Sequence, residues 1–190
     1  MSSGIWNRIL RINLSENKVK VEHLSNEEWK KYLGGTGIGT KVLYDECNKN
    51  TNLLRFVMWV IFATGPFQGT KIPGSGKFVI VGKSPLTNTF AVSAAGANFA
   101  NRFKKTGFDA LIVQGKALEP SYIWVDAATV VDRKCLDIWG KNALESTTIL
   151  KKQIEYNDIS IATIGRAGEN QVGCACIVVD EHSFAGRCGL

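Results

Sequence analysis

The stretch Val57-Met58-Trp59-Val60-Ile61-Phe62-Ala63 is a continuous apolar run, and the loop Thr64-Gly65-Pro66 follows it directly. A run of this length between turn residues is typical of a strand that is buried on both faces. Residues 77–82 alternate and are rich in β-branched side chains, and residues 110–113 and 122–125 repeat the pattern. We therefore expect these four segments to be strands, some of them fully buried.

The opening of the chain predicts a hairpin and then two helices. Apolar residues alternate over residues 6–14 and again over 18–24, with a turn at residues 15–17. Ser25 and Glu28 have the spacing of a capping box, which predicts a short helix to Leu33. Gly34-Gly35 ends that helix, and residues 36–46 can form the next one.

Further helical spacing occurs over residues 98–105 and 143–154, and the second helix is expected to bury Leu144, Ile149 or Leu150, and Ile154. Strands outnumber helices and do not alternate regularly with them, which favours an α+β fold with largely antiparallel sheet. Residues 60–77 and residues 160–179 both follow the order strand, glycine loop, strand, which is a weak internal echo. It predicts a fold of two related halves.

Composition limits the functions open to the chain. Its 190 residues, 45% of them hydrophobic, fit one compact domain, and no apolar run approaches the roughly 20 residues of a membrane span. With no signal peptide in view, the five cysteines are expected to be free thiols in the cytoplasm. The net charge of +6 suits either an anionic ligand or a plain solvated surface. Nucleic-acid binding is not expected, because the basic residues form no stripe.

Several ordered motifs together resemble the tungsten-dependent aldehyde ferredoxin oxidoreductase family, and the similarity runs along essentially all 190 residues. The motifs that carry it are residues 6–14, Tyr32-Leu33-Gly34-Gly35-Thr36-Gly37-Ile38-Gly39, Phe62-Ala63-Thr64-Gly65-Pro66, Pro73-Gly74-Ser75-Gly76-Lys77-Phe78, Lys83-Ser84-Pro85-Leu86-Thr87, Gly107-Phe108-Asp109-Ala110, Trp139-Gly140-Lys141, residues 161–170 and 172–180, and Ala185-Gly186-Arg187.

The resemblance implies the amino-terminal, pterin-cradling domain of a longer oxidoreductase, an α+β domain that spans residues 1–190. In that family a tungsten bis-pyranopterin with a bridging magnesium ion oxidises aldehydes to carboxylic acids, and a 4Fe-4S cluster passes the electrons to ferredoxin. The cluster-binding and substrate-channel domains are absent from this sequence, so we expect the chain to be inactive alone and to need those domains or a partner chain. The alternative is a non-catalytic pterin-cofactor binding module or a truncated remnant; exposed docking surface would favour a homo-oligomer in either case.

The same resemblance points to particular cofactor-binding residues. Lys77 stands where the family has an arginine, so it keeps the charge and loses the planar fork of donors. Gly186 and Arg187 match a second arginine on a glycine turn, in which Cys188 replaces a glycine. Ala94 aligns with an asparagine that helps to hold magnesium, and Ser93 or Asn98 would have to substitute for it near Gly96. A surface role for Lys77 and a helix-capping role for Asn98 remain alternatives.

Two other patterns receive structural interpretations. Gly34 to Gly39 fits a helix-to-helix turn that needs positive φ, or a close approach to a bulky ligand, better than a nucleotide fingerprint. Cys174 and Cys176 lack the spacing of a zinc or iron-sulfur site, and we expect them to be buried thiols on one face of an apolar strand. No residue of the chain is predicted to be catalytic or to bind a metal through its side chain.

Overall fold

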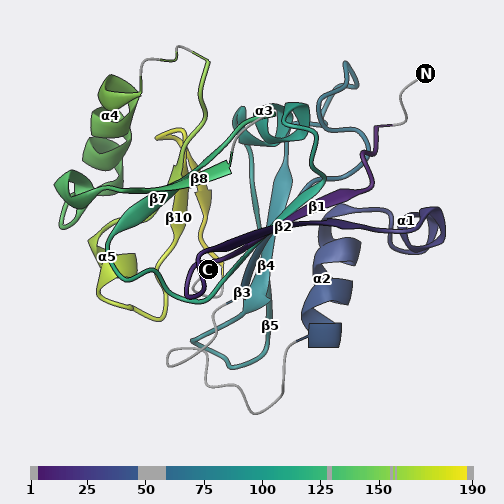
Figure 1. The fold of residues 1–190 in the computed structure, drawn as a ribbon, viewed down its shortest axis with the longest axis horizontal. Coiled ribbons are helices and arrows are strands. Elements are labelled where there is room, and N and C mark those ends of the chain that lie inside the picture. The colour runs from purple at the N-terminus through teal and green to yellow at the C-terminus, as the bar shows by residue number, and fades with distance from the viewer. Residues whose placement is uncertain (1–3, 47–58, 128–129, 155, 157, 188–190) are drawn as a thin grey trace.

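The computed structural model describes residues 4–46, 59–127, 130–154, 156 and 158–187 (Figure 1). In chain order the elements are β1 (Arg8–Asn13), β2 (Lys18–His23), α1 (Asn26–Tyr32), α2 (Gly35–Glu46), β3 (Trp59–Ala63), β4 (Phe78–Lys83), β5 (Phe90–Ala95), α3 (Phe99–Lys105), β6 (Ala110–Gln114), β7 (Ser121–Val125), β8 (Val130–Lys134), the 3-10 helix η1 (Leu136–Ile138), α4 (Ala143–Gln153), β9 (Ala162–Thr163), α5 (Arg166–Glu169), β10 (Ile177–Val179) and β11 (Ser183–Ala185).

The predicted hairpin and the first two helices are confirmed. β1 and β2 pair antiparallel, and Asn17 in their turn has a φ of 51°, a conformation that asparagine adopts more readily than most residues. α1 begins at the predicted capping box, in which Ser25 and Glu28 each accept a backbone N–H of the other. α2 follows after Gly34, whose φ is +84°. The helix-to-helix turn is thus confirmed at Leu33-Gly34, but the rest of the glycine segment, from Gly35 to Gly39, is the first part of α2.

A six-stranded sheet forms the first layer, in the order β2-β1-β6-β3-β4-β5. Among the described strands every neighbouring pair is antiparallel except β1 and β6, which are parallel. β3, β4, β6 and β7 confirm the four predicted strands, although Val57 and Met58 lie outside the described residues. The α+β class with largely antiparallel sheet is therefore correct, and β5 is a strand that the pattern did not reveal.

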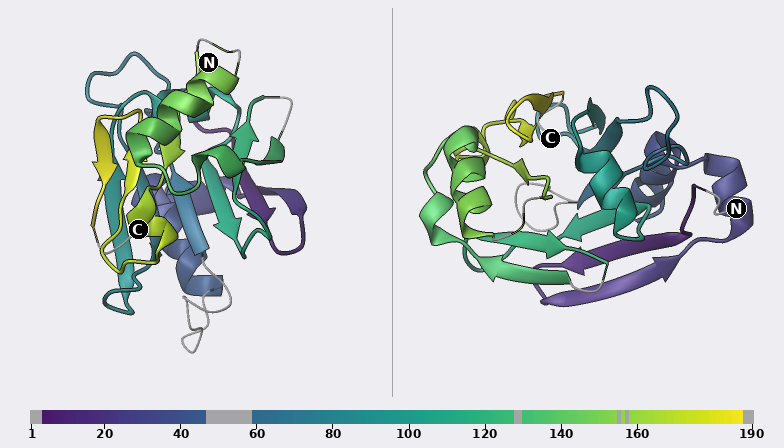
Figure 2. Two further views of the ribbon diagram at one scale, coloured as in Figure 1. Left: turned by 90° about the vertical axis from the view of Figure 1, so that its left-hand side faces the viewer. Right: turned by 90° about the horizontal axis from the view of Figure 1, so that it is seen from above.

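The second half of the chain forms two smaller sheets, a β7-β8 hairpin and a three-stranded sheet in the order β11-β10-β9. The helix predicted over residues 143–154 is α4, and the one predicted over 98–105 is α3. Part of the loop expected at residues 165–168 is the short helix α5. The two hairpins run along one side of the molecule and the C-terminal strands lie on the opposite side (Figure 2, right).

The two halves repeat the same order of elements: a hairpin, a short helix, a longer helix and a three-stranded antiparallel meander. The strand registers agree residue by residue between the meanders β3-β4-β5 and β9-β10-β11. The row Phe62, Ile80, Ser93 across the first corresponds to the row Ala162, Val179, Ser183 across the second. The internal echo in the sequence thus has a structural counterpart.

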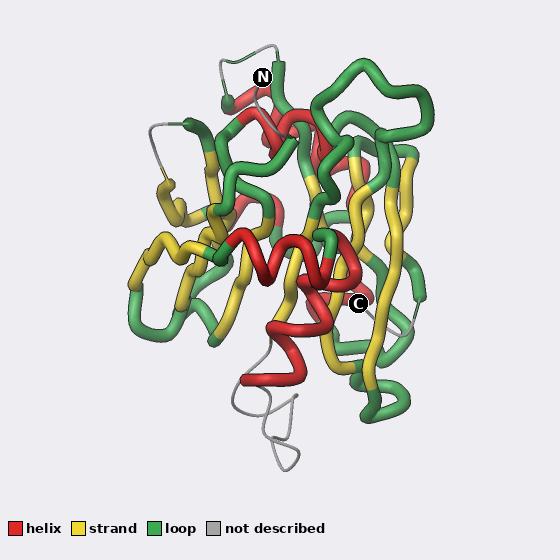
Figure 3. Tube along the Cα trace, turned by 90° about the vertical axis from the view of Figure 1, so that its right-hand side faces the viewer, coloured by secondary structure: helices red, strands yellow, loops and turns green. Residues whose placement is uncertain are grey.

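The inner faces of the two meanders share one core. It contains the corresponding pairs Phe78 and Ile177, Ile80 and Val179, and Ala95 and Ala185. On the outer face of the first meander, α2 packs against β4 and β3, and α1 and α2 lie in front of the strands in Figure 3. α4 lies on the opposite flank of the molecule and contacts β9 (Figure 1). The repeat therefore places both meanders between two flanking helices.

Two expectations about individual side chains are wrong. Cys174 and Cys176 are not on a strand, because β10 begins at Ile177; they lie in the preceding turn, with Cys174 exposed and Cys176 half-buried. Leu144 in the first turn of α4 is 54% exposed, and Leu150 is the residue of that helix that packs in a core, with Cys135 and Ile161.

No helix in the described ranges has the length and apolar character that crossing a bilayer requires.

Candidate anion-binding junction of the two meanders

The predicted cofactor-binding residues gather where β5 meets β11. β5 is the outermost strand of the six-stranded sheet and β11 is the outermost strand of the three-stranded sheet, so each is an edge strand. The two edges lie against each other and are joined by two hydrogen bonds. Gly96 N–H donates to Ser183 Oγ at 2.7 Å, and Arg187 N–H donates to Ser93 Oγ at 3.3 Å.

Lys77 stands at one end of this junction. It immediately precedes β4, and because Phe78 pairs with Ala95, Lys77 lies alongside Gly96. Its carbonyl accepts a hydrogen bond from Gln68 Nε2 at 2.7 Å, which ties the start of β4 to the loop after β3. The Lys77 side chain is exposed. Lys77 therefore stands at the start of the strand predicted over residues 77–82.

Ser93 and Ala94 point in opposite directions, as neighbours on a strand must. Ser93 is 2% exposed, and its hydroxyl faces the backbone of Arg187. Ala94 is exposed on the other face, in the position that corresponds to Phe184 of the second meander. Asn98 precedes α3 without a side-chain capping bond, and its N–H donates to Asp180 Oδ2 at 3.3 Å.

The two glycines of the junction are not required by the packing of the described residues. Neither Gly96 nor Gly186 has a positive φ. A Cβ at Gly96 would lie 3.6 Å from Ser183 Oγ, and one at Gly186 would lie 3.6 Å from Cys176 Cβ, both ordinary contact distances. Because glycine has no side chain, the backbone of both turns is left uncovered, which suits the close approach of a ligand.

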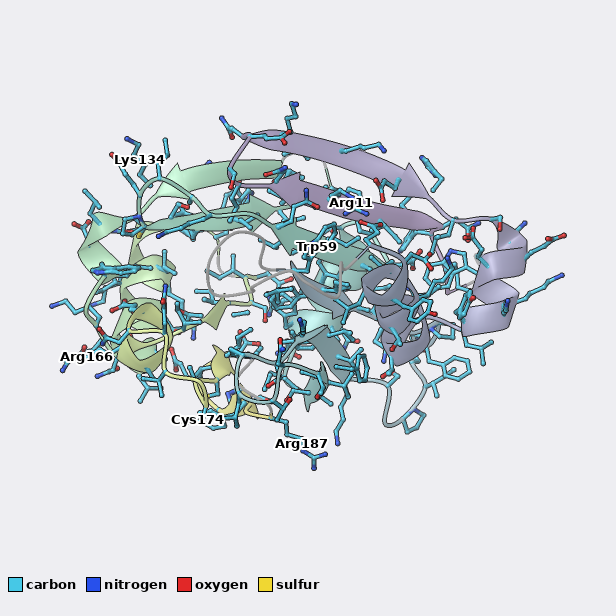
Figure 4. The ribbon with its side chains drawn as sticks, turned by 90° about the horizontal axis from the view of Figure 1, so that it is seen from below. Arg11, Trp59, Lys134, Arg166, Cys174 and Arg187 are labelled. Atoms are coloured by element: carbon cyan, nitrogen blue, oxygen red, sulfur yellow. The ribbon has the colours of Figure 1, made fainter. Side chains whose placement is uncertain are left out.

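The electrostatics of the junction favour anions. Arg187 is exposed and its side chain points away from the body at the lower edge of the molecule in Figure 4. Among the described residues, neither Lys77 nor Arg187 has a carboxylate within the 4.0 Å of an ion pair. Two exposed cations without acidic partners attract phosphate-like groups. Cys188, the remaining predicted residue, lies outside the described residues.

A cavity near the junction went unpredicted. It has a volume of about 410 Å³ and is lined by Asn142, Ala143, Gly165, Arg166, Ala167, Cys176 and Val178. Arg166 Nε donates to the Gly140 carbonyl at 2.8 Å, which fixes this arginine beside the start of α4. The motif Gly165-Arg166-Ala167-Gly168 belongs to the internal echo, but the cavity depends on the position of α4 in the fold, which local sequence does not indicate.

Within the described ranges, no group of three or more His, Cys, Asp or Glu side chains could hold a metal ion. The chemistry available at the junction is the binding of anionic groups by two exposed cations, since the Gly96 and Arg187 backbone N–H groups already donate to the two serine hydroxyls.

Residues 9–190 match the family described as aldehyde ferredoxin oxidoreductase, N-terminal domain. The chain is 38% identical over 187 residues to the tungsten-containing aldehyde ferredoxin oxidoreductase of Pyrococcus horikoshii, and it is also 38% identical to that of Thermococcus kodakarensis. Each alignment covers 98% of this chain and 31% of the relative. A protein named aliphatic sulfonate oxidoreductase, WOR-like subunit, from Pyrococcus furiosus is 30% identical over 197 residues, covering 96% of this chain and 31% of that protein.

One solved structure superposes on the whole chain with a TM-score of 0.94 and 29% sequence identity, covering 100% of this chain and 29% of the other. It is described as the active site complex BamBC of benzoyl coenzyme A reductase, in complex with 1,5-dienoyl-CoA. The chain thus spans about a third of the length of the curated relatives that it matches.

Proposed function

Because the chain belongs to the aldehyde ferredoxin oxidoreductase family, through its N-terminal domain, we propose that the β5–β11 junction cradles the phosphates and pterins of a tungsten cofactor. The residues that would hold it are Lys77, the Gly96 turn and Gly186-Arg187. The observation that carries this proposal is the convergence of residues from two distant parts of the chain, 77–96 and 186–187, at one pair of edge strands.

The internal repeat supports a ligand with two similar anionic ends. Gly96 and Gly186 follow corresponding strands, and each half contributes one exposed cation to the junction, Lys77 from the first and Arg187 from the second. A cofactor of two pterins, each with a phosphate, has the same twofold character. Lys77 offers a compact point charge, whereas Arg187 can form a paired contact with a phosphate, so the two ends would be held with different geometry.

The residues fit the magnesium ion less completely than they fit the phosphates. Ala94 has no side-chain oxygen, and the Ser93 hydroxyl is buried against Arg187. A magnesium ion here would therefore depend on phosphate oxygens, water and main-chain carbonyls of the edge strands, all of which are suitable hard ligands. The bound cofactor would supply the two-electron oxidation of an aldehyde to a carboxylic acid.

This chain would orient the cofactor, and the other parts of the enzyme would come from elsewhere. We propose that the 4Fe-4S cluster, the substrate channel and the contact with ferredoxin belong to the two-thirds of the relatives' length that this chain does not match, whether in the same polypeptide or in a partner chain. Under this proposal the 190 residues alone do not oxidise aldehydes, and they function in the cytoplasm.

The test is the metal content of the protein purified anaerobically from its native host together with whatever copurifies. We expect about one tungsten per chain, with iron from the rest of the enzyme. Arg187→Met and Lys77→Met should each lose most of the tungsten, because each removes a phosphate-binding cation. Lys30→Met, at an exposed lysine on α1, is the matched control and should retain it. Tungsten without iron would indicate a cofactor-binding module, and neither tungsten nor molybdenum would leave a folded remnant.

A further inference from the structure

The two hydrogen bonds at the β5–β11 junction form a reciprocal pair. Ser183 of the second half holds the N–H of Gly96, three residues beyond Ser93, and Ser93 of the first half holds the N–H of Arg187, four residues beyond Ser183. Each serine therefore fixes the turn that follows the other serine. The two residues also occupy corresponding positions, because Ser93 pairs with Ile80 and Ser183 pairs with Val179 in matching registers.

The two edge strands rely on these side chains because no ladder joins them. β5 and β11 belong to different sheets, and over the described residues no backbone-to-backbone hydrogen bond connects them. Ser93 is 2% exposed, so water is poorly placed to replace its hydroxyl, and Ser183 is half-buried. Loss of one hydroxyl would leave a backbone N–H without its partner and would free one turn to shift.

We propose that Ser93 and Ser183 are paired positioning residues that set the spacing between the Gly96 turn and the Gly186-Arg187 turn, and so select a ligand with two anionic groups at a fixed separation. This inference rests on the proposed function for the identity of the ligand. Its physical basis is preorganisation: two turns held at the correct distance bind both phosphates without a further loss of backbone freedom. The serines act through the turns and do not touch the ligand.

The first measurement is amide hydrogen exchange followed by NMR, which reports the two bonds separately and needs no cofactor. In Ser183→Ala the Gly96 amide should exchange about three to ten times faster, as expected for the loss of one hydrogen bond of ordinary net strength, and the Arg187 amide should change less. In Ser93→Ala the pattern should reverse. Ser15→Ala is the matched control, because Ser15 Oγ accepts the N–H of the distant Lys116 at 2.9 Å and lies away from the junction.

The second measurement is the affinity for inorganic pyrophosphate, a probe with two linked phosphates, compared with that for inorganic phosphate. Either alanine variant should weaken pyrophosphate binding about three- to tenfold and change phosphate binding little, and Ser183→Thr, which retains a hydroxyl, should restore it. Unchanged exchange at Gly96 in Ser183→Ala, or equal pyrophosphate affinity in all variants, would overturn the inference. Failure of the cofactor proposal is read separately, as the absence of tungsten and molybdenum from the wild-type protein.

Discussion

At the scale of single residues, Gly34 shows how the glycine turn is constrained by its neighbours. A Cβ built there would lie 2.9 Å from the Thr64 carbonyl oxygen and 3.2 Å from Gly65 Cα, and φ is +84°. Gly74 has a similar φ of +80° with nothing within 4 Å. We expect Gly74→Ala to lower the free energy of unfolding by about 1 kcal/mol, the usual penalty of the left-handed conformation. Gly34→Ala should lower it by about 1–3 kcal/mol more, because backbone atoms must also move. Urea denaturation measures both, and equal losses would show that the close approach has no energetic weight.

Single residues differ in how far the sequence alone predicts their conformation and contacts. The need for positive φ at Gly34 was predictable, because two adjacent glycines separate two helical patterns. The partners of Ser93 and Ser183 were not, because each hydroxyl meets a backbone N–H 87 or more residues away. The exposure of Cys174 was missed because the apolar run that follows it begins pairing only at Ile177.

At the scale of elements, α1 to α4 can be predicted from local chemistry, and helix capping can be tested on two asparagines. Asn142 caps α4 through a capping box, in which its Oδ1 accepts the Glu145 N–H at 2.9 Å. Asn98 stands at the same position before α3 and makes no side-chain capping bond. Asn142→Ala should lower the free energy of unfolding by about 1 kcal/mol, whereas Asn98→Ala should lower it by only about 0.3 kcal/mol. Comparable losses in thermal or urea unfolding would mean that the Asn142 bond contributes little.

The short strands mark the limit of prediction at this scale. β9 has two residues and β10 and β11 have three each, which is shorter than the roughly four to eight residues over which alternation of apolar and polar side chains identifies a strand. They are strands because the shared core of Phe78, Ile177 and Ala185 holds them in register, and such contacts join residues about 100 positions apart. The glycine loops in the sequence indicate the repeat, but they do not show which residues of the strands pair.

At the scale of the whole molecule, one buried ion pair connects the segments that frame the junction. Lys104 Nζ at the end of α3 contacts Asp109 Oδ1 just before β6, and their side chains are 4% and 0% exposed. Lys104 Nζ also donates to the Gly65 carbonyl at 3.1 Å, and Asp109 Oδ2 accepts the Trp6 N–H at 2.9 Å. The Asp109 carbonyl accepts the Thr64 N–H at 2.9 Å. The pair therefore ties the start of the chain to the loop after β3, an arrangement that nothing in local sequence indicates.

Breaking this pair should destabilise the protein strongly and with a characteristic dependence on pH. Burial lowers the pKa of the Lys104 ammonium from its ordinary value of 10.5, and the hydrogen bond and charge of Asp109 oppose that shift. Asp109→Asn removes the opposing charge and leaves a buried cation without a counterion, which costs about 3–5 kcal/mol of unfolding free energy at neutral pH. Lys104→Met in the same background removes the unpaired charge, and the asparagine can still accept the Trp6 N–H. The double variant should therefore be more stable than Asp109→Asn alone.

The sign of the pH effect follows from the lowered pKa of Lys104. Between that pKa and 10.5 the unfolded chain binds more protons at this lysine than the folded chain does, so stability rises with pH across the window. Asp109→Asn lowers the folded pKa further, and the variant should regain part of its lost stability relative to wild type as the pH is raised from 7 toward 10. The double variant has no lysine at position 104 and should show no such recovery. Urea unfolding of all three proteins at both pH values provides the comparison. A parallel pH dependence of Asp109→Asn and the double variant would show that the Lys104 charge is not what destabilises the single variant.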